Sequence, residues 1–418
     1  MRRILIIVAG VIVVLGIAIG IYFLIFSKGA ATLSVGNPFG NTGSGTVTPG
    51  GDLPSTDEVV SSAGVDIAPR LVKVTDGPIA LGMSAIDVQL PGVPTTDTAV
   101  NASSTASTTL AKPPTIPDVE GRFIDRASGN VYAYTAHART LVRISNKTLP
   151  GVQRASWTAD GTRAYAQFLS SADGSEHVGT YALDATGGSG YLLEQDLVQA
   201  SVAGSSTLFT LFSGTTGSVG TIAQADGSKS RTLFSSLLSS IIVHPTSGNL
   251  YAATKAASEV GGYGFSINRT SGAFTRILGP LQGLSLLPSP SGSEVIYSYI
   301  SGGVYHLAVL DIASHSATAL PVATLSEKCA WAANGLSAYC GVPTGLSGNL
   351  PDDWYQGATS FTDRIWKIDL TGRVATLVVD PSQIGAISVD AVALSVDPAE
   401  DMLFFTDKRS GALYAYDL

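Results

Sequence analysis

Charged residues, histidines and cysteines are scarce in this sequence of 418 residues. Asp, Glu, Lys and Arg make up 13% of it, with 5 histidines and 2 cysteines. No HExxH pair, DxDxDG calcium loop or Gly-x-Ser-x-Gly nucleophile motif occurs, so local spacing supports neither a metal site nor a hydrolase. The sequence therefore predicts no catalytic residue, no metal and no cofactor. We interpret His244, which precedes a proline, as a turn residue.

Positive charge is in the minority, because the formal net charge is −8. A protein whose main partner is nucleic acid needs a basic surface. Docking on anionic lipid headgroups needs one as well. We therefore expect no nucleic-acid partner, and membrane contact only through a hydrophobic segment.

Such a segment is present at the N-terminus. Ile4 to Phe26 contains no charged or amide side chain, and a helix of this length spans the roughly 30 Å hydrocarbon core. The alternative is a cleavable signal peptide, whose apolar region has only about 7–15 residues. Arg2 and Arg3 precede the run, which predicts a cytoplasmic N-terminus and an extracytoplasmic body. Residues 1–28 are thus predicted to be a cytoplasmic stub and a transmembrane helix of a single-pass cell-membrane protein.

Two tracts rich in small and polar residues follow. Residues 29–62 consist mostly of Gly, Ser, Thr and Pro, and residues 92–118 are similar. Such compositions bury too little apolar surface to offset the entropy of ordering. We predict a flexible tether at 29–62, a folded body at 63–418 and a disordered loop insertion at 92–118.

A repeated stretch organises the body. Trp157-Thr-Ala-Asp-Gly-Thr-Arg-Ala-Tyr165 and Trp331-Ala-Ala-Asn-Gly-Leu-Ser-Ala-Tyr339 each predict strand, tight turn and strand. Looser copies of the stretch also occur. Taken together, the copies place the turns at Gly161, Ser205, Gly248, Gly292, Gly335 and Asp401, with gaps of 44, 43, 44, 43 and 66 residues. A period in the low forties with about four strands per unit is typical of a β-propeller. The predicted fold is all-β, a seven-bladed propeller with six or eight blades as the nearest alternatives.

The two ends of the body complete each other. The last unit, which starts near Asp390, has three strands before Leu418, and the first unit around Gly121–Asn146 lacks its inner strand. Residues 69–75 supply the missing outer strand of the last blade, and 77–88 the inner strand of the first. The ring is then closed by strands from both ends of the chain, which leaves no open edge there.

The Trp-x-Ala-Asp/Asn-Gly pattern, together with Ser289-Pro-Ser-Gly292, resembles the TolB-like (PD40) class of WD40-like propellers over about 69–418. The chain is also similar to uncharacterised membrane-anchored propellers of candidate-phylum bacteria. The stretches that carry this similarity are Val119–Gly129, Arg143–Pro150 and Pro351–Gly357. These resemblances imply the architecture and export, and they imply no activity.

The extra residues of the longest gap predict a long loop at 341–362 in the sixth blade. It holds Asp352, Asp353, Trp354 and Tyr355. Loops on a rigid scaffold often carry binding residues, and two carboxylates beside two aromatics suit a cationic, peptide or sugar group. The alternative is that Trp354 and Tyr355 pack under the loop and hold it in place.

The only two cysteines, Cys329 and Cys340, bracket the second repeat motif. A two-residue type I′ turn at Asn334-Gly335 pairs Ala330 with Tyr339 and Cys329 with Cys340. Cys329 and Cys340 then form a hydrogen-bonded pair with Cα atoms about 5.5 Å apart, within disulfide range. Export makes an oxidising compartment plausible, so we predict a disulfide. The alternative is two buried thiols that stay reduced.

We therefore expect a non-enzymatic binding or scaffold module of the cell envelope. Its partner is predicted to be an envelope protein, a peptide or a cell-wall polymer. The alternative is a lyase- or lactonase-like propeller enzyme with its site in the central channel, because such a site takes one residue from each of several blades and leaves no local motif.

Overall fold

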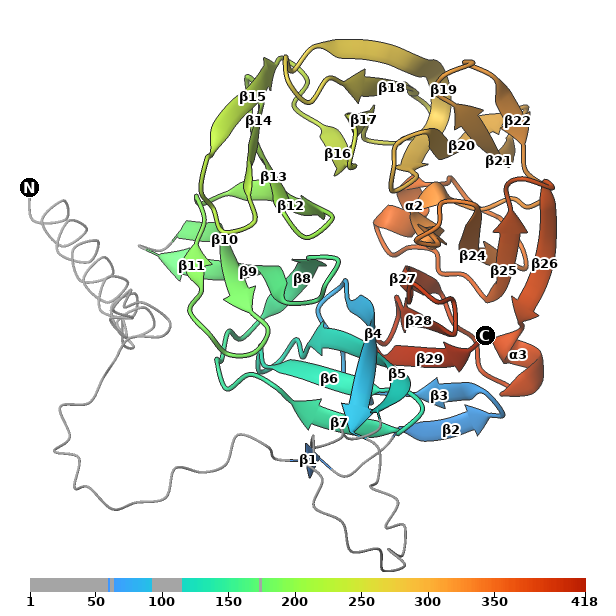
Figure 1. Cartoon of the computed structure of the whole chain (residues 1–418). Helices are drawn as coiled ribbons and strands as arrows, with labels where there is room; N and C mark the ends of the chain where they lie inside the picture. Colours follow the sequence, from blue (N-terminus) through green and yellow to red (C-terminus); the bar gives the residue numbers. More distant parts are fainter. Residues whose placement is uncertain (1–58, 61–63, 92–114, 173–174) are drawn as a thin grey trace, which may run out of the picture. The chain divides into compact units, whose positions relative to one another are not determined.

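Short antiparallel strands make up nearly all of the regular structure. The computed structural model describes residues 59–60, 64–91, 115–172 and 175–418. Apart from Ala172, these residues belong to one compact unit, and its sheets follow one another around a ring (Figure 1). Among the described residues, no helix is long and apolar enough to cross a membrane. The predicted transmembrane helix at 1–28 lies outside them.

The first half of the ring contains three sheets. The first has the strand order β1-β7-β6-β5-β4, the second β11-β10-β9-β8, and the third β12-β13-β14-β15. Their strands are β1 (Val59–Val60), β4 (Ser84–Pro91), β5 (Thr115–Ile124), β6 (Val131–Thr135), β7 (Thr140–Arg143), β8 (Val152–Trp157), β9 (Arg163–Ala172), β10 (Ser175–Asp184), β11 (Tyr191–Leu192), β12 (Leu197–Ala203), β13 (Thr207–Gly214), β14 (Gly217–Gln224) and β15 (Arg231–Ser236).

The second half contains a seven-stranded sheet, β16 to β22 in order, a sheet β23-β24-β25-β26, and a sheet β2-β3-β29-β28-β27. Their strands are β16 (Ile241–Pro245), β17 (Leu250–Thr254), β18 (Gly261–Ile267), β19 (Phe274–Pro288), β20 (Glu294–Ser301), β21 (Val304–Asp311), β22 (Ala317–Ala319), β23 (Cys329–Trp331), β24 (Ser337–Pro343), β25 (Asp363–Asp369), β26 (Val374–Val379), β27 (Ala391–Val396), β28 (Met402–Asp407), β29 (Leu413–Asp417), β2 (Val65–Ala68) and β3 (Leu71–Lys73). Three short helices lie in the connections: η1 (Ser326–Lys328), α2 (Asp352–Tyr355) and α3 (Pro381–Ile384).

Strand β19 joins two groups of strands into the seven-stranded sheet. Its residues 274–282 pair with β18, and its residues 282–288 pair with β20. The shift of partner occurs around Gln282, where the register of both pairings changes. Each half of this sheet therefore contains four strands, as the sheets on either side of it do.

Strands from both ends of the chain meet in the last sheet. β3 pairs with β29, with Ala415 opposite Val72, so residues 71–73 take the place predicted for 69–75. β2 adds a further strand outside β3. The inner strand of the first sheet, β4, begins at Ser84 and not at Gly77. The first residues of the predicted inner strand, Ile79 and Leu81, form only isolated bridges.

Two predicted loop segments are too long. Thr115 to Asp118 belong to β5 and pair with β4, so the insertion predicted at 92–118 has its last four residues in a strand. Val59–Val60 form β1 and pair with β7, so the tether predicted at 29–62 also reaches too far. In both cases the sheet supplies backbone partners to residues that the composition of the surrounding segment assigns to a loop.

The repeat motif builds one kind of turn. Gly335 has φ 69° and its N–H donates to Ala332 at 3.0 Å, while the Ala332 N–H donates to Ser337 at 2.9 Å. This is a four-residue loop of residues 333–336, and the predicted two-residue type I′ turn is wrong. That turn needs positive φ at both central residues, and Asn334 is not among the residues with positive φ. The same pair of hydrogen bonds recurs around Gly161 and Gly292.

In the last sheet the equivalent residue is Glu400, with φ 61°. Its N–H donates to Asp397 at 3.1 Å, as the glycine N–H does in the other turns. The turn position predicted at Asp401 is therefore wrong by one residue. Glu400 accepts hydrogen bonds from Tyr339 and Lys367 of the neighbouring sheet, at 2.8 and 2.7 Å. These bonds hold an otherwise unfavourable backbone conformation.

The core lies between neighbouring sheets. One cluster joins Ile296 and Val309 of the seven-stranded sheet to Ala338 and Ile368 of the β23–β26 sheet. Because side chains alternate between the two faces of a strand, each sheet of the ring can contribute residues to the clusters on both of its faces. The resulting stack of sheets is a rigid support for the connecting loops.

Candidate functional site

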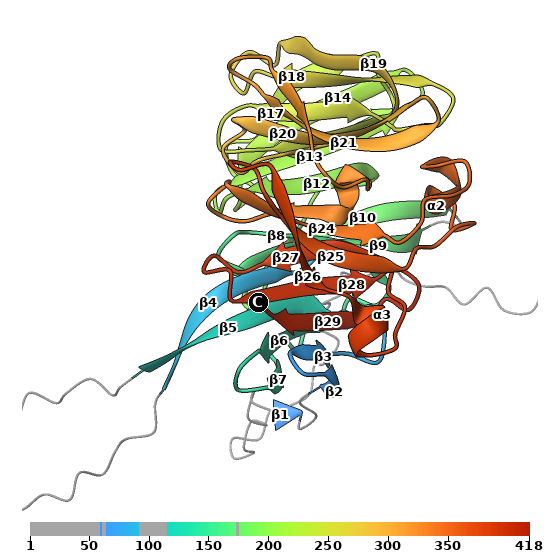
Figure 2. The same ribbon diagram turned by 90° about the vertical axis from the view of Figure 1, so that its right-hand side faces the viewer.

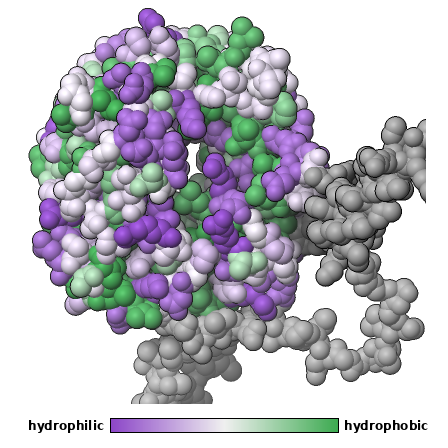
Figure 3. Space-filling view, turned by 180° about the vertical axis from the view of Figure 1, so that it is seen from behind, coloured by the Kyte–Doolittle hydropathy of each residue, from purple (hydrophilic) through white to green (hydrophobic). Residues whose placement is uncertain are grey.

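The predicted binding residues lie in the connection between β24 and β25, where Asp352–Tyr355 form the short helix α2. Figure 2 shows α2 and α3 on one face of the ring, opposite the long β4–β5 hairpin. Seen from behind, in Figure 3, the ring has a narrow opening at its centre with hydrophilic side chains around it. The connection thus lies on the face at one end of the channel.

Trp354 is buried, with 5% of its surface exposed. It belongs to a cluster with Tyr305, Leu325 and Phe361, and it stacks on Phe361 with ring centroids 6.2 Å apart. Its Nε1–H donates to Asp390 Oδ2 at 3.0 Å. Trp354 therefore fixes the loop to the next sheet, as the packing alternative proposed.

A buried ion cluster lies beneath Trp354. Lys328 is fully buried, and its Nζ lies 2.8 Å from Asp363 Oδ2 and donates to the Ala391 carbonyl at 3.0 Å. It also pairs with Asp390, which accepts the N–H of Phe361 at 3.1 Å. Such a cluster is stable only when its members stay together, because one unpaired buried charge is costly.

Burial raises the pKa of the Asp363 carboxyl to about 6, while Lys328 acts in the opposite direction. Asp363 Oδ2 accepts the Ala391 N–H at 2.6 Å. Asp363 Oδ1 is buried without a hydrogen-bond partner among the described residues. The cluster links β25 to the start of β27 and so joins two sheets close to the loop.

The other predicted residues also have partners within the protein. Asp352 accepts the N–H of Ser258 at 2.7 Å, and hydrogen bonding from Ser258 lowers the pKa of this carboxyl. Asp353 accepts the N–H of Asn349 at 2.8 Å. The Tyr355 hydroxyl donates to Glu327 at 2.6 Å, and burial raises the pKa of Tyr355. The structure brings the four predicted residues together as anchors that face different partners.

A small hollow near α2 contains two titratable groups that the sequence analysis did not bring together. His244 of β16 and Glu327 of η1 line it with Ile242, Leu284 and Ser285. The prediction that His244 is a turn residue is wrong, because it pairs with Tyr251 within the sheet. Burial lowers the pKa of His244 to about 4 and raises the pKa of Glu327.

The structure joins Cys329 and Cys340 in a disulfide. The predicted pairing of residues is found, with Ala330 opposite Tyr339. The Cα atoms are 4.0 Å apart, so the expected spacing of about 5.5 Å is wrong. The four-residue turn makes Ala332–Ser337 a hydrogen-bonded pair, and alternation then places the cysteines at a non-hydrogen-bonded pair, where strands lie closer.

Across the part of the chain that the structure describes, no group of three or more His, Cys, Asp or Glu side chains is arranged to hold a metal ion. The buried lysine supplies a cation to its two aspartates. The described side chains at α2 are bonded within the protein and so hold the loops in place.

No protein-family profile matches the sequence, and no curated protein matches it. Solved structures do. An oligogalacturonate lyase from Vibrio parahaemolyticus has 9% identity and a TM-score of 0.51, with 72% of this chain and 86% of that chain covered. An oligogalacturonate lyase in complex with manganese has 11% identity and a TM-score of 0.50 over the same shares. TolB from Acinetobacter baumannii has 12% identity and a TM-score of 0.38, over 60% of this chain and 65% of that chain.

The fold is a β-propeller. At these identities the likeness shows the fold alone, since propellers host many unrelated functions. Sequence reasoning found the long loop that contains α2 and the disulfide, but it missed Lys328, Asp363 and Asp390. The position of Lys328 directly before the apolar strand β23 is the one sequence signal for a buried cation.

Proposed function

We propose that this protein is a membrane-anchored, extracytoplasmic propeller of seven blades that binds and positions a partner in the cell envelope. The seven-stranded sheet counts as two blades that share β19. Two features support the location: the uncharged run from Ile4 to Phe26 preceded by two arginines, and the Cys329–Cys340 disulfide. Disulfides persist in oxidising compartments.

The observation that carries the binding role is the rigidity of the ring, which extends to its α2 loop. Three side chains attach it to separate places: Asp352 to Ser258, Tyr355 to Glu327 and Trp354 to Asp390. A loop held at several points keeps one surface, and binding costs less when little has to be ordered. A partner that is a protein, a peptide or a cell-wall polymer would meet a preformed face.

One observation favours the alternative of an enzyme. His244 and Glu327 line the same hollow, and burial shifts their pKa values toward each other. Active sites often contain such shifted groups. A neutral imidazole beside a carboxyl suits proton transfer, so His244→Ala and Glu327→Gln are the variants that would abolish turnover of an envelope polysaccharide if the alternative holds.

Topology is tested in intact cells with a protease applied from outside. A tag after Leu418 is expected to be cleaved, and a tag before Met1 to be protected, because Arg2 and Arg3 keep the N-terminus inside. Binding is tested by cross-linking the full-length protein in its membrane and recovering the same partner repeatedly. Protection of the C-terminal tag would refute the location. Polysaccharide turnover that depends on His244 would refute the non-enzymatic role.

A further inference from the structure

One sheet of the ring is incompletely covered by its neighbour. The outer strand of the second sheet, β11, has 2 residues, whereas β15 and β26 have 6 each. After β11 the chain follows β10 irregularly, with N–H donation from Leu193 to Thr180 and from Asp196 to Val178, both at 2.9 Å. The short strand therefore leaves part of the facing β12–β15 sheet without a covering layer.

The two faces of the β12–β15 sheet differ accordingly. On one face Phe209 and Leu211 are fully buried against the next sheet. On the other face, toward β11, Phe212 is 40% exposed and Val219 is 36% exposed. These two residues are opposite each other on β13 and β14, so they form one exposed apolar pair.

Two hollows lie along this open side. The larger, of about 300 Å³, has Leu197, Leu208 and Ala223 as apolar lining and Thr210 and Thr221 as hydroxyl groups. The second, of about 200 Å³, contains Phe212, Val219 and Leu237. Leu208, Thr210 and Phe212 alternate along β13 and so share one face. The hollows are consecutive parts of one groove, named here the β13–β14 groove.

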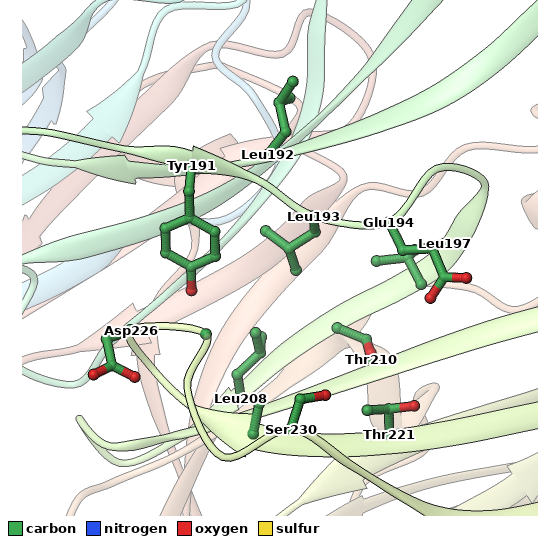
Figure 4. A pocket seen from close by; sticks show the side chains of 12 residues that line it. Tyr191, Leu192, Leu193, Glu194, Leu197, Leu208, Thr210, Thr221, Asp226 and Ser230 are labelled. Atoms are coloured by element: carbon green, nitrogen blue, oxygen red, sulfur yellow. The ribbon is translucent and has the colours of Figure 1, made fainter.

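The charges at the larger hollow have one sign. Glu194 and Asp226 lie at different ends of it in Figure 4, with the Tyr191 ring beside Asp226. Hydrogen bonding from Ser228 lowers the pKa of Asp226, which keeps this carboxylate ionised. None of the described residues that line the hollow is a lysine, arginine or histidine. Arg163 lies behind Tyr191, with Cζ 5.9 Å from the ring centroid, and donates to the Ala225 carbonyl at 2.7 Å.

We propose that the β13–β14 groove binds an extended peptide that carries a lysine side chain and, four residues away, an apolar side chain. The ammonium group lies between Glu194 and Asp226 with its alkyl chain over Leu208 and Ala223. The apolar side chain covers Phe212 and Val219. Charge complementarity selects the cation, and the exposed apolar pair, followed by Leu237 at 91% exposure, provides the area to bury.

The spacing follows from strand geometry. Leu208 and Phe212 are four residues apart on one strand, about 13 Å at roughly 3.3 Å per residue. An extended peptide along the groove has the same rise, so a lysine and a leucine at positions i and i+4 reach both hollows on the same side of the peptide. This inference rests on the proposed binding function and specifies its partner as a basic, extended peptide.

The test uses full-length protein in detergent and fluorescent peptides measured by anisotropy. The probe has lysine and leucine four residues apart among small residues. One control peptide has the same composition with the two residues adjacent, and another has acetyl-lysine. We expect the probe to bind more tightly than either control. The difference from the acetyl-lysine peptide should be about fivefold, the value of an exposed ion pair. The affinity of the probe should fall as salt is raised.

Glu194→Gln and Phe212→Ser are expected to weaken the probe, and the matched exposed variants Asp417→Asn and Leu336→Ser to leave it unchanged. Circular dichroism checks that all four variants fold. Equal binding of the three peptides, or full binding by both groove variants, would overturn the inference. If groove variants still cross-link the wild-type partner in the envelope, the groove is wrong while the proposed function stands.

Discussion

The α2 region and the β13–β14 groove have the opposite roles to those that their sequences suggest. The α2 region carries a tryptophan, carboxylates and a lysine, and these side chains are buried or bonded to one another. The groove carries leucines, threonines and serines with two carboxylates, and it is open. Residues suited to chemistry therefore stabilise the first region, while the second is available for binding because a neighbouring strand is short.

This contrast shows why residue type alone does not locate a site. A polar side chain contributes to binding only if it is not already paired, and pairing depends on the neighbouring sheet. The division between a stabilising region and a binding region can be broken by substitutions whose expected effects range from large to small.

Removal of the buried cation should have the greatest effect on stability. Lys328→Met leaves Asp363 and Asp390 buried without a counter-charge, so we expect a loss of about 3–5 kcal/mol in the free energy of unfolding. Urea denaturation measures it. Lys229→Met, at an exposed lysine, is the control. An unchanged midpoint for Lys328→Met would show that the cluster does not support the α2 region.

The disulfide should contribute less. Cys329 and Cys340 are separated by 11 residues, and closing so short a loop contributes at most about 3 kcal/mol in the chain-entropy model. The hairpin already holds the two strands together, so the cost of Cys329→Ser with Cys340→Ser should be smaller than this. Mass spectrometry of protein from the envelope should find no free thiol. Alkylation of both cysteines without reductant would contradict the bridge and the proposed compartment.

Acid should weaken the α2 side of the molecule through His244. Burial lowers its pKa from 6.5 to about 4, so unfolding takes up a proton between these values. Its contribution to stability is present above pH 6.5 and is lost as the pH falls toward 4. Because the His244 residue is only partly buried, we expect about 1–2 kcal/mol. His244→Gln should show a shallower pH dependence in denaturation, and identical curves would refute this role.

Groove variants should have the smallest effect on folding. Leu237 is 91% exposed, so Leu237→Ser should change the free energy of unfolding by no more than about 0.5 kcal/mol while it weakens the peptide probe. A large loss of stability would mean that the groove belongs to the core, and the comparison would then fail on this side.

The repeating features of the fold could be predicted from the sequence. The period around Gly161 and Gly335 predicted a propeller, and the pairing of Cys329 with Cys340 followed from counting outward from the turn. The turn type did not follow, because Asn-Gly occurs in several turns and the choice depends on whether Asn334 adopts positive φ. The turn of the last sheet was predicted at Asp401, one residue after its true position at Glu400. A glutamate adopts positive φ there because it is held by Tyr339 and Lys367, which lie 61 and 33 residues away.

The candidate sites were harder to predict for a physical reason. Trp354 and Asp352 were found by composition, but their hydrogen-bond partners, Asp390 and Ser258, lie 36 and 94 residues away. The groove had no motif at all. It arises where β11 ends after 2 residues, and strand length in a polar stretch such as residues 186–196 is decided by the neighbouring sheet.

The most direct test compares Trp354→Phe and Phe212→Ser in full-length protein, with unfolding free energy and peptide affinity measured on both. Trp354→Phe loses the hydrogen bond to Asp390 and should cost about 1.5–3 kcal/mol with unchanged peptide binding. Phe212→Ser should leave stability within about 0.5 kcal/mol and weaken the peptide several-fold. The reverse pattern, with binding lost in Trp354→Phe and kept in Phe212→Ser, would contradict the assignment of stability to α2 and binding to the groove.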